Sequence, residues 1–400
     1  MIDARKTIVV TGIGVISPYG IGLSFLRDGM LRGQCCLKPA EEIYPGFHGT
    51  VAAVAALPPQ TEVDRYSRTD RLAMAAARDA VADFTGSGSI LRESGIVMAS
   101  TVAGLTEIDP EISQGPAAWY QNGGLSRAAS YPVSRVAASV GEQLGILGPA
   151  CAVSVACASG AMAIALAANM LLDEAAPMVL AGGSDALCPF TLSGFNSLQA
   201  LDPEPCRPFN QNRNGLNIGE GAAVLVMETL AHATRRDARI LAVLRGWAMT
   251  NDASHPTAPQ KDGIGLALCI QRALEMAACD VEEVGYVNAH GTGTPLNDIA
   301  ETHAYESAFH GRSRPIPVSS TKSYFGHCLG AAGALEAAIT ISAMQSSALY
   351  PTLRLTDPIE SDRVDWLRGE LRRQPLPMAM SVSAGFGGSN AALVFGRPRA

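Results

Sequence analysis

One uncharged segment limits what this chain can fold into more than any other feature of its sequence. No charged residue occurs from Gln143 to Leu172, a stretch long enough to cross a lipid bilayer as a helix. Gly145 and the Gly148-Pro149 pair interrupt it, however, and a turn in mid-membrane would leave backbone groups without hydrogen-bond partners. The segment therefore predicts a buried strand followed by a buried helix, and we expect no membrane span.

The composition indicates a large hydrophobic interior. The chain has 400 residues, of which 48% are hydrophobic and only 17% are charged. This length exceeds the usual size of one hydrophobic core, so we expect two domains or two fused half-domains. A net charge of -7 argues against a nucleic-acid partner, because phosphate binding relies on clustered Lys and Arg.

The nine cysteines do not form a metal or disulfide pattern. Their number is odd and no Cys-x-x-Cys pair occurs, so neither a disulfide framework nor a zinc ribbon is indicated. We expect free thiols in a reducing cytoplasm. A dinucleotide cofactor is not expected either, since the Gly12-Ile13-Gly14 turn has Ser17 where the fingerprint requires a third glycine.

Strands and helices alternate along the chain. Apolar runs predict buried strands at 95–100, 152–156 and 178–181, and an Ala-rich run predicts a buried helix at 159–172. A charged stretch at 232–239 precedes a new apolar run at 240–244. We therefore predict an α/β fold divided into residues 1–239 and 240–400.

The two predicted halves resemble each other. Val155-Ala156-Cys157-Ala158-Ser159-Gly160 opens an apolar helix in the first, and the segment from Gly326 to Gly333 opens one in the second. Each helix is followed by a strand and a glycine-rich turn. The matching order predicts a duplicated α/β unit, although abundant Gly and Ala could also produce such likeness by chance.

Cys157 is the strongest candidate for a nucleophile. It lies between a predicted strand and a predicted helix, where the positive end of the helix dipole favours an anion and makes the thiol easier to ionise. Its neighbours Ala156, Ala158 and Ser159 are small and leave room for access. A buried structural cysteine is the alternative interpretation.

Three further residues could serve this thiol. His290 ends a predicted strand, and His327 begins the second apolar helix, where the dipole favours a neutral imidazole that can donate a hydrogen bond to an oxyanion. Lys322 lies in a small, polar turn before His327 and is interpreted either as a surface residue or as an electrostatic one. Neither Cys157 nor His290 has a neighbour at metal-ligand spacing, so no metal site is expected.

Five motifs in order resemble those of the β-ketoacyl-acyl carrier protein synthases, specifically the elongating condensing enzymes of type II fatty acid and polyketide synthesis. The resemblance runs almost end to end and implies the thiolase fold, a duplicated five-layered αβαβα arrangement. The motifs are Val10 to Pro18, Ala156 to Gly160, Asn288 to Thr294, Thr321-Lys322-Ser323 with Gly326-His327, and Gly385 to Asn390.

The resemblance implies a role for each of several residues. Cys157 is the acylated nucleophile, and its N–H and that of Phe386 form the oxyanion hole. His290 and His327 stabilise the enolate oxygen. The nucleophile then lies in residues 1–239, and both histidines lie in residues 240–400. The remaining implied roles are site ordering by Lys322 and Glu336, pantetheine binding by Thr292 and Thr294, and gating by Phe386 and Asp252.

The implied reaction joins an acyl chain to malonyl-carrier protein by decarboxylative Claisen condensation. It needs no resident cofactor, because phosphopantetheine arrives on the acyl carrier protein. We expect Arg65, Arg68 and Arg71 to receive that acidic carrier, with a solvated helix face as the alternative. The resemblance also implies a dimer, with an identical chain or with a chain-length factor.

Two other functions are alternatives to the condensing enzyme. A non-catalytic partner of the chain-length-factor type usually lacks the nucleophile, and thiolases or initiating synthases differ from the Cys-His-His set. Two departures from the elongating enzymes bear on substrate: Ala384 replaces a common aromatic residue, and Phe325 replaces Thr. We hypothesise that they reshape the pocket for an unusual chain such as a rigid polyene.

Overall fold

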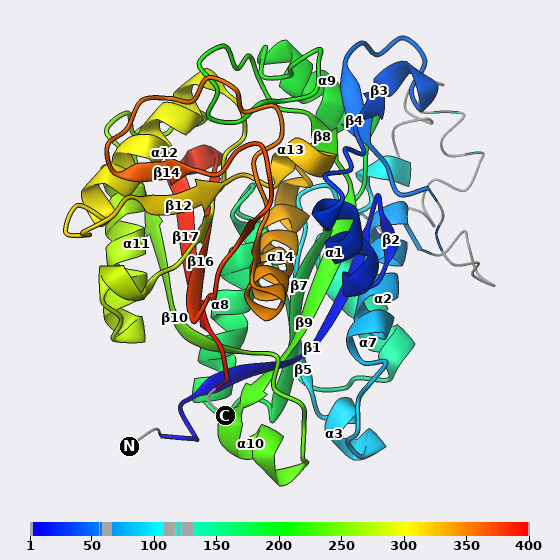
Figure 1. Ribbon diagram of the computed structural model, residues 1–400. Helices are drawn as coiled ribbons and strands as arrows, with labels where there is room; N and C mark the ends of the chain where they lie inside the picture. The colour runs from blue at the N-terminus through cyan, green and yellow to red at the C-terminus, as the bar shows by residue number, and fades with distance from the viewer. Residues whose placement is uncertain are drawn as a thin grey trace.

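The fold consists of two α/β units that follow one another along the chain (Figure 1). The computed structural model describes residues 3–55, 57, 66–107, 115, 117, 121 and 131–398. Arg65, one of the predicted docking residues, lies outside this described part.

The first unit is a sheet with helices on both faces. Its strands lie in the spatial order β1-β9-β7-β5-β6. They are β1 (Ile8–Ser17), β5 (Gly95–Ala99), β6 (Ala150–Val153), β7 (Met178–Asp185) and β9 (Gly221–Thr229). Helices α2 (Arg68–Ala80) and α7 (Ser134–Leu144) cover one face, and α8 (Ser159–Leu172) covers the other.

The second unit repeats this design, with the order β10-β17-β16-β11-β12 and β14 added at the edge. Its strands are β10 (Ala242–Asn251), β11 (Val287–Asn288), β12 (Ile316–Ser319), β14 (Val364–Trp366), β16 (Met378–Gly385) and β17 (Ser389–Gly396). Its main helices are α11 (Ile264–Ala277), α12 (Pro295–Ala308) and α14 (Ala332–Ser346).

Strand directions show that the units share one topology. In the first, β5 runs parallel to β6 and β7, and β9 runs antiparallel to β7 and β1. In the second, β11 runs parallel to β12 and β16, and β17 runs antiparallel to β16 and β10. The predicted duplication is confirmed. The two sheets join where Ile8–Val10 pairs antiparallel with Ala242–Leu244.

The layers follow the predicted order αβαβα, with α8 and α14 packed between the two sheets (Figure 1). These two helices approach each other closely. A Cβ atom on Gly160 would lie 2.6 Å from the backbone nitrogen of Ala334, and one on Gly333 would lie 2.6 Å from that of Ala161. Glycine and alanine are therefore needed where the central helices meet, which explains the small-residue composition.

Shorter elements connect these layers. The helices are α1 (Leu23–Leu31), α3 (Gly88–Arg92), α9 (Pro189–Ser197), α10 (Leu230–Arg235) and α13 (Lys322–Phe325), and the 3₁₀ segments are η1 (Ala40–Glu42), η4 (Val281–Glu283), η5 (Leu329–Ala331) and η6 (Phe386–Gly388). The short strands are β2 (Gly20–Ile21), β3 (Lys38–Pro39), β4 (Thr50–Ala52), β8 (Ile218–Gly219), β13 (Ala348–Leu349) and β15 (Arg372–Arg373). The division at residues 239 and 240 stays a prediction; α10 lies between the two units.

The uncharged segment forms strand β6 and helix α8, as predicted. Helix α8 has the predicted bounds, Ser159–Leu172. The predicted strand at 152–156 is wrong at its C-terminal end, because β6 ends at Val153 and a turn follows. Among the described residues, no helix is both long and apolar enough to cross a membrane.

Candidate functional site

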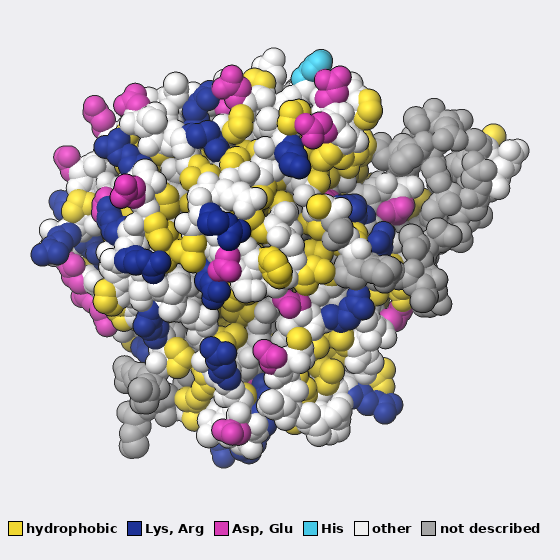
Figure 2. Space-filling view, turned by 45° about the vertical axis from the view of Figure 1, so that its right-hand side comes forward, with side chains coloured by type: hydrophobic (Ala, Val, Ile, Leu, Met, Phe, Trp, Pro, Cys, Tyr) yellow, Lys and Arg dark blue, Asp and Glu magenta, His cyan; other side chains and the backbone are white. Residues whose placement is uncertain are grey.

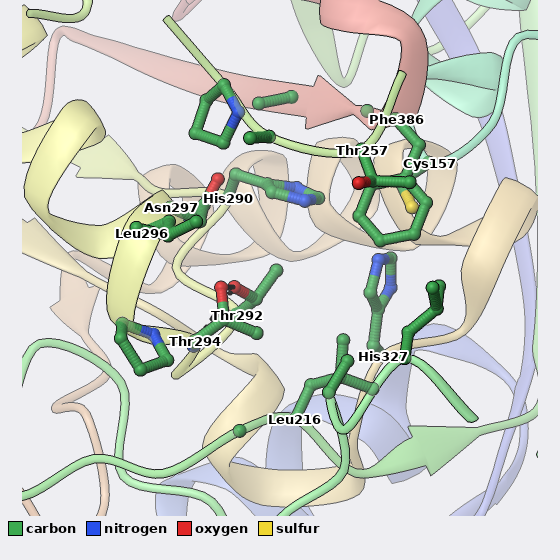
Figure 3. Close-up of a pocket in the computed structure, with 18 of the residues that line it drawn as sticks. Cys157, Leu216, Thr257, His290, Thr292, Thr294, Leu296, Asn297, His327 and Phe386 are labelled. Carbon is green, nitrogen blue, oxygen red and sulfur yellow. Dashed lines mark hydrogen bonds between the residues drawn. The ribbon is translucent and has the colours of Figure 1, made fainter. Parts of the chain in front are cut away.

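A cavity of about 530 Å³ brings together residues from both units. Its lining includes Cys157 from the first unit, and His290, His327 and Phe386 from the second. Figure 3 shows the two imidazole rings and the Phe386 ring turned toward the Cys157 sulfur. The three residues predicted to carry the chemistry therefore lie in one pocket, although they are far apart in the sequence.

A tight turn before α8 positions the Cys157 thiol. The Ser159 hydroxyl accepts a hydrogen bond from the Val155 N–H at 2.8 Å and donates one to the Ala156 carbonyl at 2.5 Å. Ala156 has a φ of 50°, a strained left-handed conformation for a residue with a side chain. Gly385 packs against this turn, where an added Cβ would lie 3.1 Å from the Cys157 nitrogen.

Burial dominates the electrostatics of Cys157. The residue is 7% exposed, and this burial raises the pKa of its thiol to about 11, although Lys322 and the Phe386 backbone N–H act in the opposite direction. The prediction that Cys157 ionises more easily than an ordinary cysteine is therefore wrong for this buried thiol. The Phe386 N–H donates to the Cys157 sulfur, and the oxyanion hole formed with the Cys157 N–H stays a prediction.

His290 is fixed from two sides. The Glu301 carboxylate accepts hydrogen bonds from the backbone N–H groups of His290 and Gly291, both at 2.7 Å. The Lys322 ammonium donates to the His290 Nδ1 atom at 3.2 Å, so the ring proton resides on Nε2. Burial first, then Lys322 and His327, hold the pKa of His290 well below its ordinary value.

His327 adopts the same tautomer by a different contact. The backbone N–H of Leu329 donates to the His327 Nδ1 atom at 3.2 Å, so its ring proton also lies on Nε2. That Nε2 atom is buried and has no hydrogen-bond partner among the described residues. Burial, followed by Lys322, holds the pKa of His327 well below its ordinary value, so the ring is neutral as predicted.

The three side chains form a compact set of donors. One ligand-type atom from each of Cys157, His290 and His327 lies within 4.8 Å of the others, and the two rings meet edge to face at 5.2 Å. Such atoms could suit a metal ion, but both Nδ1 atoms face donors and leave the inward Nε2 atoms protonated. The arrangement instead presents two N–H donors beside a thiol, which suits an oxyanion better than a metal.

Lys322 is buried, so its interpretation as a surface residue is wrong. Its ammonium forms an ion pair with Glu336 and donates to the His290 carbonyl at 2.5 Å. Both side chains of the pair are only 3% exposed. Burial raises the pKa of Glu336 to about 7, although Lys322 opposes this shift. Lys322 thus connects Glu336 to His290, and the site-ordering role of the two residues stays a prediction.

The predicted pantetheine and gating residues also border the cavity. Thr292 and Thr294 line it, and their hydroxyls share a hydrogen bond of 2.9 Å. Asp252 lies on the loop opposite Phe386: its N–H donates to the Gly388 carbonyl at 2.8 Å, and its carboxylate accepts from Asn390 at 2.7 Å. Their roles in binding and gating stay predictions.

Sequence reasoning missed several residues of the site. Phe195 on α9 lies 5.7 Å from the Phe386 ring, measured between ring centres. Glu301 and Asp298 on α12 were also missed; Asp298 accepts backbone hydrogen bonds from Phe209 and Gly293. A signal was present for the two acids, since carboxylates three residues apart directly after a Gly-Thr loop lie on one helix face.

The docking arginines differ from the predicted basic face. Arg68 turns inward, and its guanidinium pairs with the fully buried Glu220 at 2.5 Å and donates to the Val54 carbonyl. Arg71 is half-buried. On the face shown in Figure 2, basic side chains are interspersed with acidic ones. Arg68 therefore has a structural contact that sequence reasoning did not foresee, and docking by Arg68 and Arg71 stays a prediction.

The two departures that concern substrate differ in position. Ala384 lines the cavity, but Phe325 does not. Phe325 packs edge to face on Tyr19, 6.1 Å away, and borders a small cavity behind Lys322 and Glu336. Phe325 therefore does not border this cavity directly, and its effect on the acyl chain stays a prediction.

Comparison with known proteins agrees with this geometry. The profile of the β-ketoacyl synthase N-terminal domain matches residues 5–233, and that of the C-terminal domain matches residues 241–356. The chain belongs to the β-ketoacyl synthase family. It is an acyl-transferring condensing enzyme with the thiolase fold.

Its relatives come from both fatty acid and polyketide synthesis. A Streptomyces rimosus protein named as an oxytetracycline polyketide β-ketoacyl synthase 1 is 36% identical, over 99% of this chain and 98% of its own. The 3-oxoacyl-[acyl-carrier-protein] synthase 2 of Coxiella burnetii is 34% identical, over 98% and 99%. The solved ishigamide ketosynthase/chain length factor has a TM-score of 0.92 and 29% identity, over 98% of this chain and 99% of its own.

Proposed function

We propose that Cys157 accepts an acyl chain from a carrier protein and that His290 and His327 then support its condensation with malonyl-carrier protein. The observation that carries this assignment is the convergence of one thiol and two imidazole Nε2–H donors in one buried pocket. Each donor is held in its tautomer before substrate arrives, so stabilising a new charge requires little reorganisation.

The first step is thioester exchange. The Cys157 sulfur attacks the carbonyl of the acyl-carrier thioester, and the oxyanion lies between the N–H groups of Cys157 and Phe386. The carbon–sulfur bond to the carrier then breaks, and the thiol proton of Cys157 ends on the released carrier thiol. Because burial raises the pKa of this thiol, the step depends on Lys322 and the Phe386 N–H to favour the thiolate.

The second step is decarboxylative condensation. The malonyl carboxylate leaves as carbon dioxide, and the resulting enolate oxygen accepts hydrogen bonds from His290 and His327. The enolate carbon attacks the acyl carbonyl on Cys157, and the Cys157 thiolate leaves and takes up a proton. A pocket that excludes water protects both the acyl-enzyme and the enolate during this sequence.

The same geometry disfavours the alternative functions. A chain-length-factor-type subunit needs no thiol beside two donor histidines, whereas this pocket holds all three in reach of one another. The catalytic residues of thiolases and initiating synthases differ from the Cys-His-His set. We propose that the enzyme needs no resident cofactor, since the chain's own donors stabilise each charge, and that it works in the cytoplasm, where its nine free cysteines stay reduced.

The partners follow from the reaction and from one sheet edge. The carrier protein delivers both substrates through the cavity that Thr292 and Thr294 line. Among the residues that the structure describes, strand β6 ends the sheet and pairs only with β5. It carries the uncharged, partly exposed run Ala150–Val153. An unprotected edge of this kind supports a dimer, with an identical chain or with a chain-length factor.

Intact-protein mass spectrometry tests the assignment. We expect the wild-type chain to gain one acyl group from acyl-carrier protein and Cys157→Ala to gain none, while Cys188→Ala, which changes another buried cysteine, remains acylated. An acylated Cys157→Ala protein would refute the assignment. Product analysis after adding malonyl-carrier protein then separates a condensing enzyme from a subunit that only binds the chain.

A further inference from the structure

Asp185, the last residue of β7, is a buried carboxylate that the proposed reaction does not use. It is fully buried, and both of its oxygens accept several hydrogen bonds. Its Oδ1 atom accepts from the Ser100 hydroxyl at 2.5 Å and the Val102 N–H at 2.9 Å. Its Oδ2 atom accepts from the Thr101 hydroxyl at 2.6 Å and the Gly330 N–H at 2.7 Å.

The bond to Gly330 crosses from the first unit to the turn that follows His327 in the second. In this turn the Leu329 N–H donates to His327 Nδ1, and the next N–H, of Gly330, donates to Asp185. Leu329 has a φ of 51°, a strained conformation that surrounding contacts must hold. An added Cβ at Gly330 would lie 2.8 Å from the Asp185 carboxylate, so the turn and the carboxylate are in close contact.

We propose that Asp185 is a positioning residue for His327. By accepting the hydrogen bond from the Gly330 N–H, it fixes the strained turn in which the Leu329 N–H donates to His327 Nδ1. That donation keeps the ring proton of His327 on Nε2. This inference rests on the proposed function, because the Nε2–H is the donor assigned to the enolate. Asp185 contacts none of the reacting atoms in this scheme and positions His327 through the backbone of residues 329 and 330. Its charge also contributes to the raised pKa of the Cys157 thiol.

The variant Asp185→Asn separates shape from hydrogen bonding. An amide keeps the size of the carboxylate but can accept on one side only. If the amide oxygen faces Ser100 and Val102, the NH₂ group faces the Gly330 N–H, and two donors meet without an acceptor. If the amide is flipped, the NH₂ group faces the Val102 N–H instead, with the same result there. Thr101→Val is a milder variant, because it removes one donor to Oδ2 and leaves the carboxylate in place.

Glu228→Gln is the matched control. Glu228 is also fully buried and also accepts several hydrogen bonds, from Thr11, His232 and Arg236. It lies on β9 and does not line the catalytic cavity. Any effect that comes merely from losing a buried carboxylate should therefore appear in Glu228→Gln as well.

Two measurements on the full chain test the inference. The first follows the tautomer of His327 by ¹⁵N NMR of histidine-labelled protein, with His327→Gln to assign the signals. Wild type and Glu228→Gln should show the Nε2–H tautomer, and Asp185→Asn should show a mixture, with Thr101→Val between them. An unchanged His327 signal in both Asp185→Asn and Thr101→Val would overturn the inference, and it would do so whether or not the protein condenses malonyl-carrier protein.

The second measurement separates the two partial reactions. Decarboxylation of malonyl-carrier protein should fall about 100-fold in Asp185→Asn, the effect expected of a misplaced catalytic group. Acylation of Cys157 should not fall, because loss of the Asp185 charge removes a contribution that raises the pKa of the thiol. An equal loss of both reactions, or the same split in Glu228→Gln, would overturn it. If wild type itself fails to decarboxylate, the proposed function fails, and the NMR result still decides the role of Asp185.

Discussion

Two opposing effects determine how easily the Cys157 thiol ionises. The N-terminal end of α8 and the Lys322 ammonium favour the thiolate, whereas burial favours the neutral thiol. Burial prevails and raises the pKa from 9.0 to about 11. Such a shift corresponds to about 3 kcal/mol, and at neutral pH it leaves about 100-fold less thiolate than an ordinary cysteine has.

Alkylation with iodoacetamide across pH 7 to 10 measures this directly. We expect the rate at Cys157 to rise about tenfold per pH unit over the whole range without reaching a plateau, because only the thiolate reacts. In Lys322→Met the rate at each pH should fall further, since the charge that lowers the pKa of Cys157 is lost. Peptide-level mass spectrometry isolates Cys157 from the other cysteines, and the exposed Cys35 serves as an internal reference.

A plateau at or below pH 9 would refute this reasoning. It would show that the helix end and Lys322 together outweigh burial, and so restore the easier ionisation that the sequence predicts from the helix end. A rate at Cys157 that does not depend on pH would indicate that access to the pocket, and not ionisation, limits the reaction.

Three further substitutions test separate parts of the structure. Arg68→Ala should lower the free energy of unfolding by about 2 to 3 kcal/mol in urea titrations, because Glu220 would remain buried without its cation; unchanged stability with weaker carrier binding would instead favour docking. The Tyr305 phenol donates to Glu301 at 2.6 Å, and this hydrogen bond lowers the pKa of Glu301, which is about 7. Tyr305→Phe removes the bond and should raise that pKa, so the acid limb of the pH–activity profile should move to higher pH. An acid limb that does not move would contradict this. Ala384→Phe should narrow the cavity and shift products toward shorter chains, as chromatography of the released chains would show, whereas an unchanged distribution would remove the idea that Ala384 sets chain length.

The sequence predicts the fold well because its signals are local and repeated. The helix at Ser159–Leu172 is correct at both ends, since its Ala-rich run begins at a serine and stops at Asp173. Duplication follows from the order of motifs and is confirmed by matching strand directions. The end of β6 was missed because the Ser159 hydroxyl bonds back to the preceding turn, a contact that no periodicity reveals.

The sequence predicts which residues form the site, but it does not predict their burial or their pKa values. Cys157, His290 and His327 were selected because their residue types and positions at element ends are unusual, and the fold brings them together. The raised pKa of Cys157 and the burial of Lys322 depend on how many layers surround the pocket, which a single segment does not encode. Asp185 is hidden for the same reason, because its importance arises from a bond to Gly330, which lies in the other unit.

Duplication also explains how the reacting groups meet. Cys157 precedes α8 in the first unit, and His327 precedes α14 at the matching place in the second. Because Gly160 and Gly333 let these two central helices touch, the thiol and the imidazole that lie at their N-terminal ends come within reach of each other. The close helix contact that fills the middle layer is thus also the contact that assembles the site, so packing and chemistry in this enzyme depend on the same small residues.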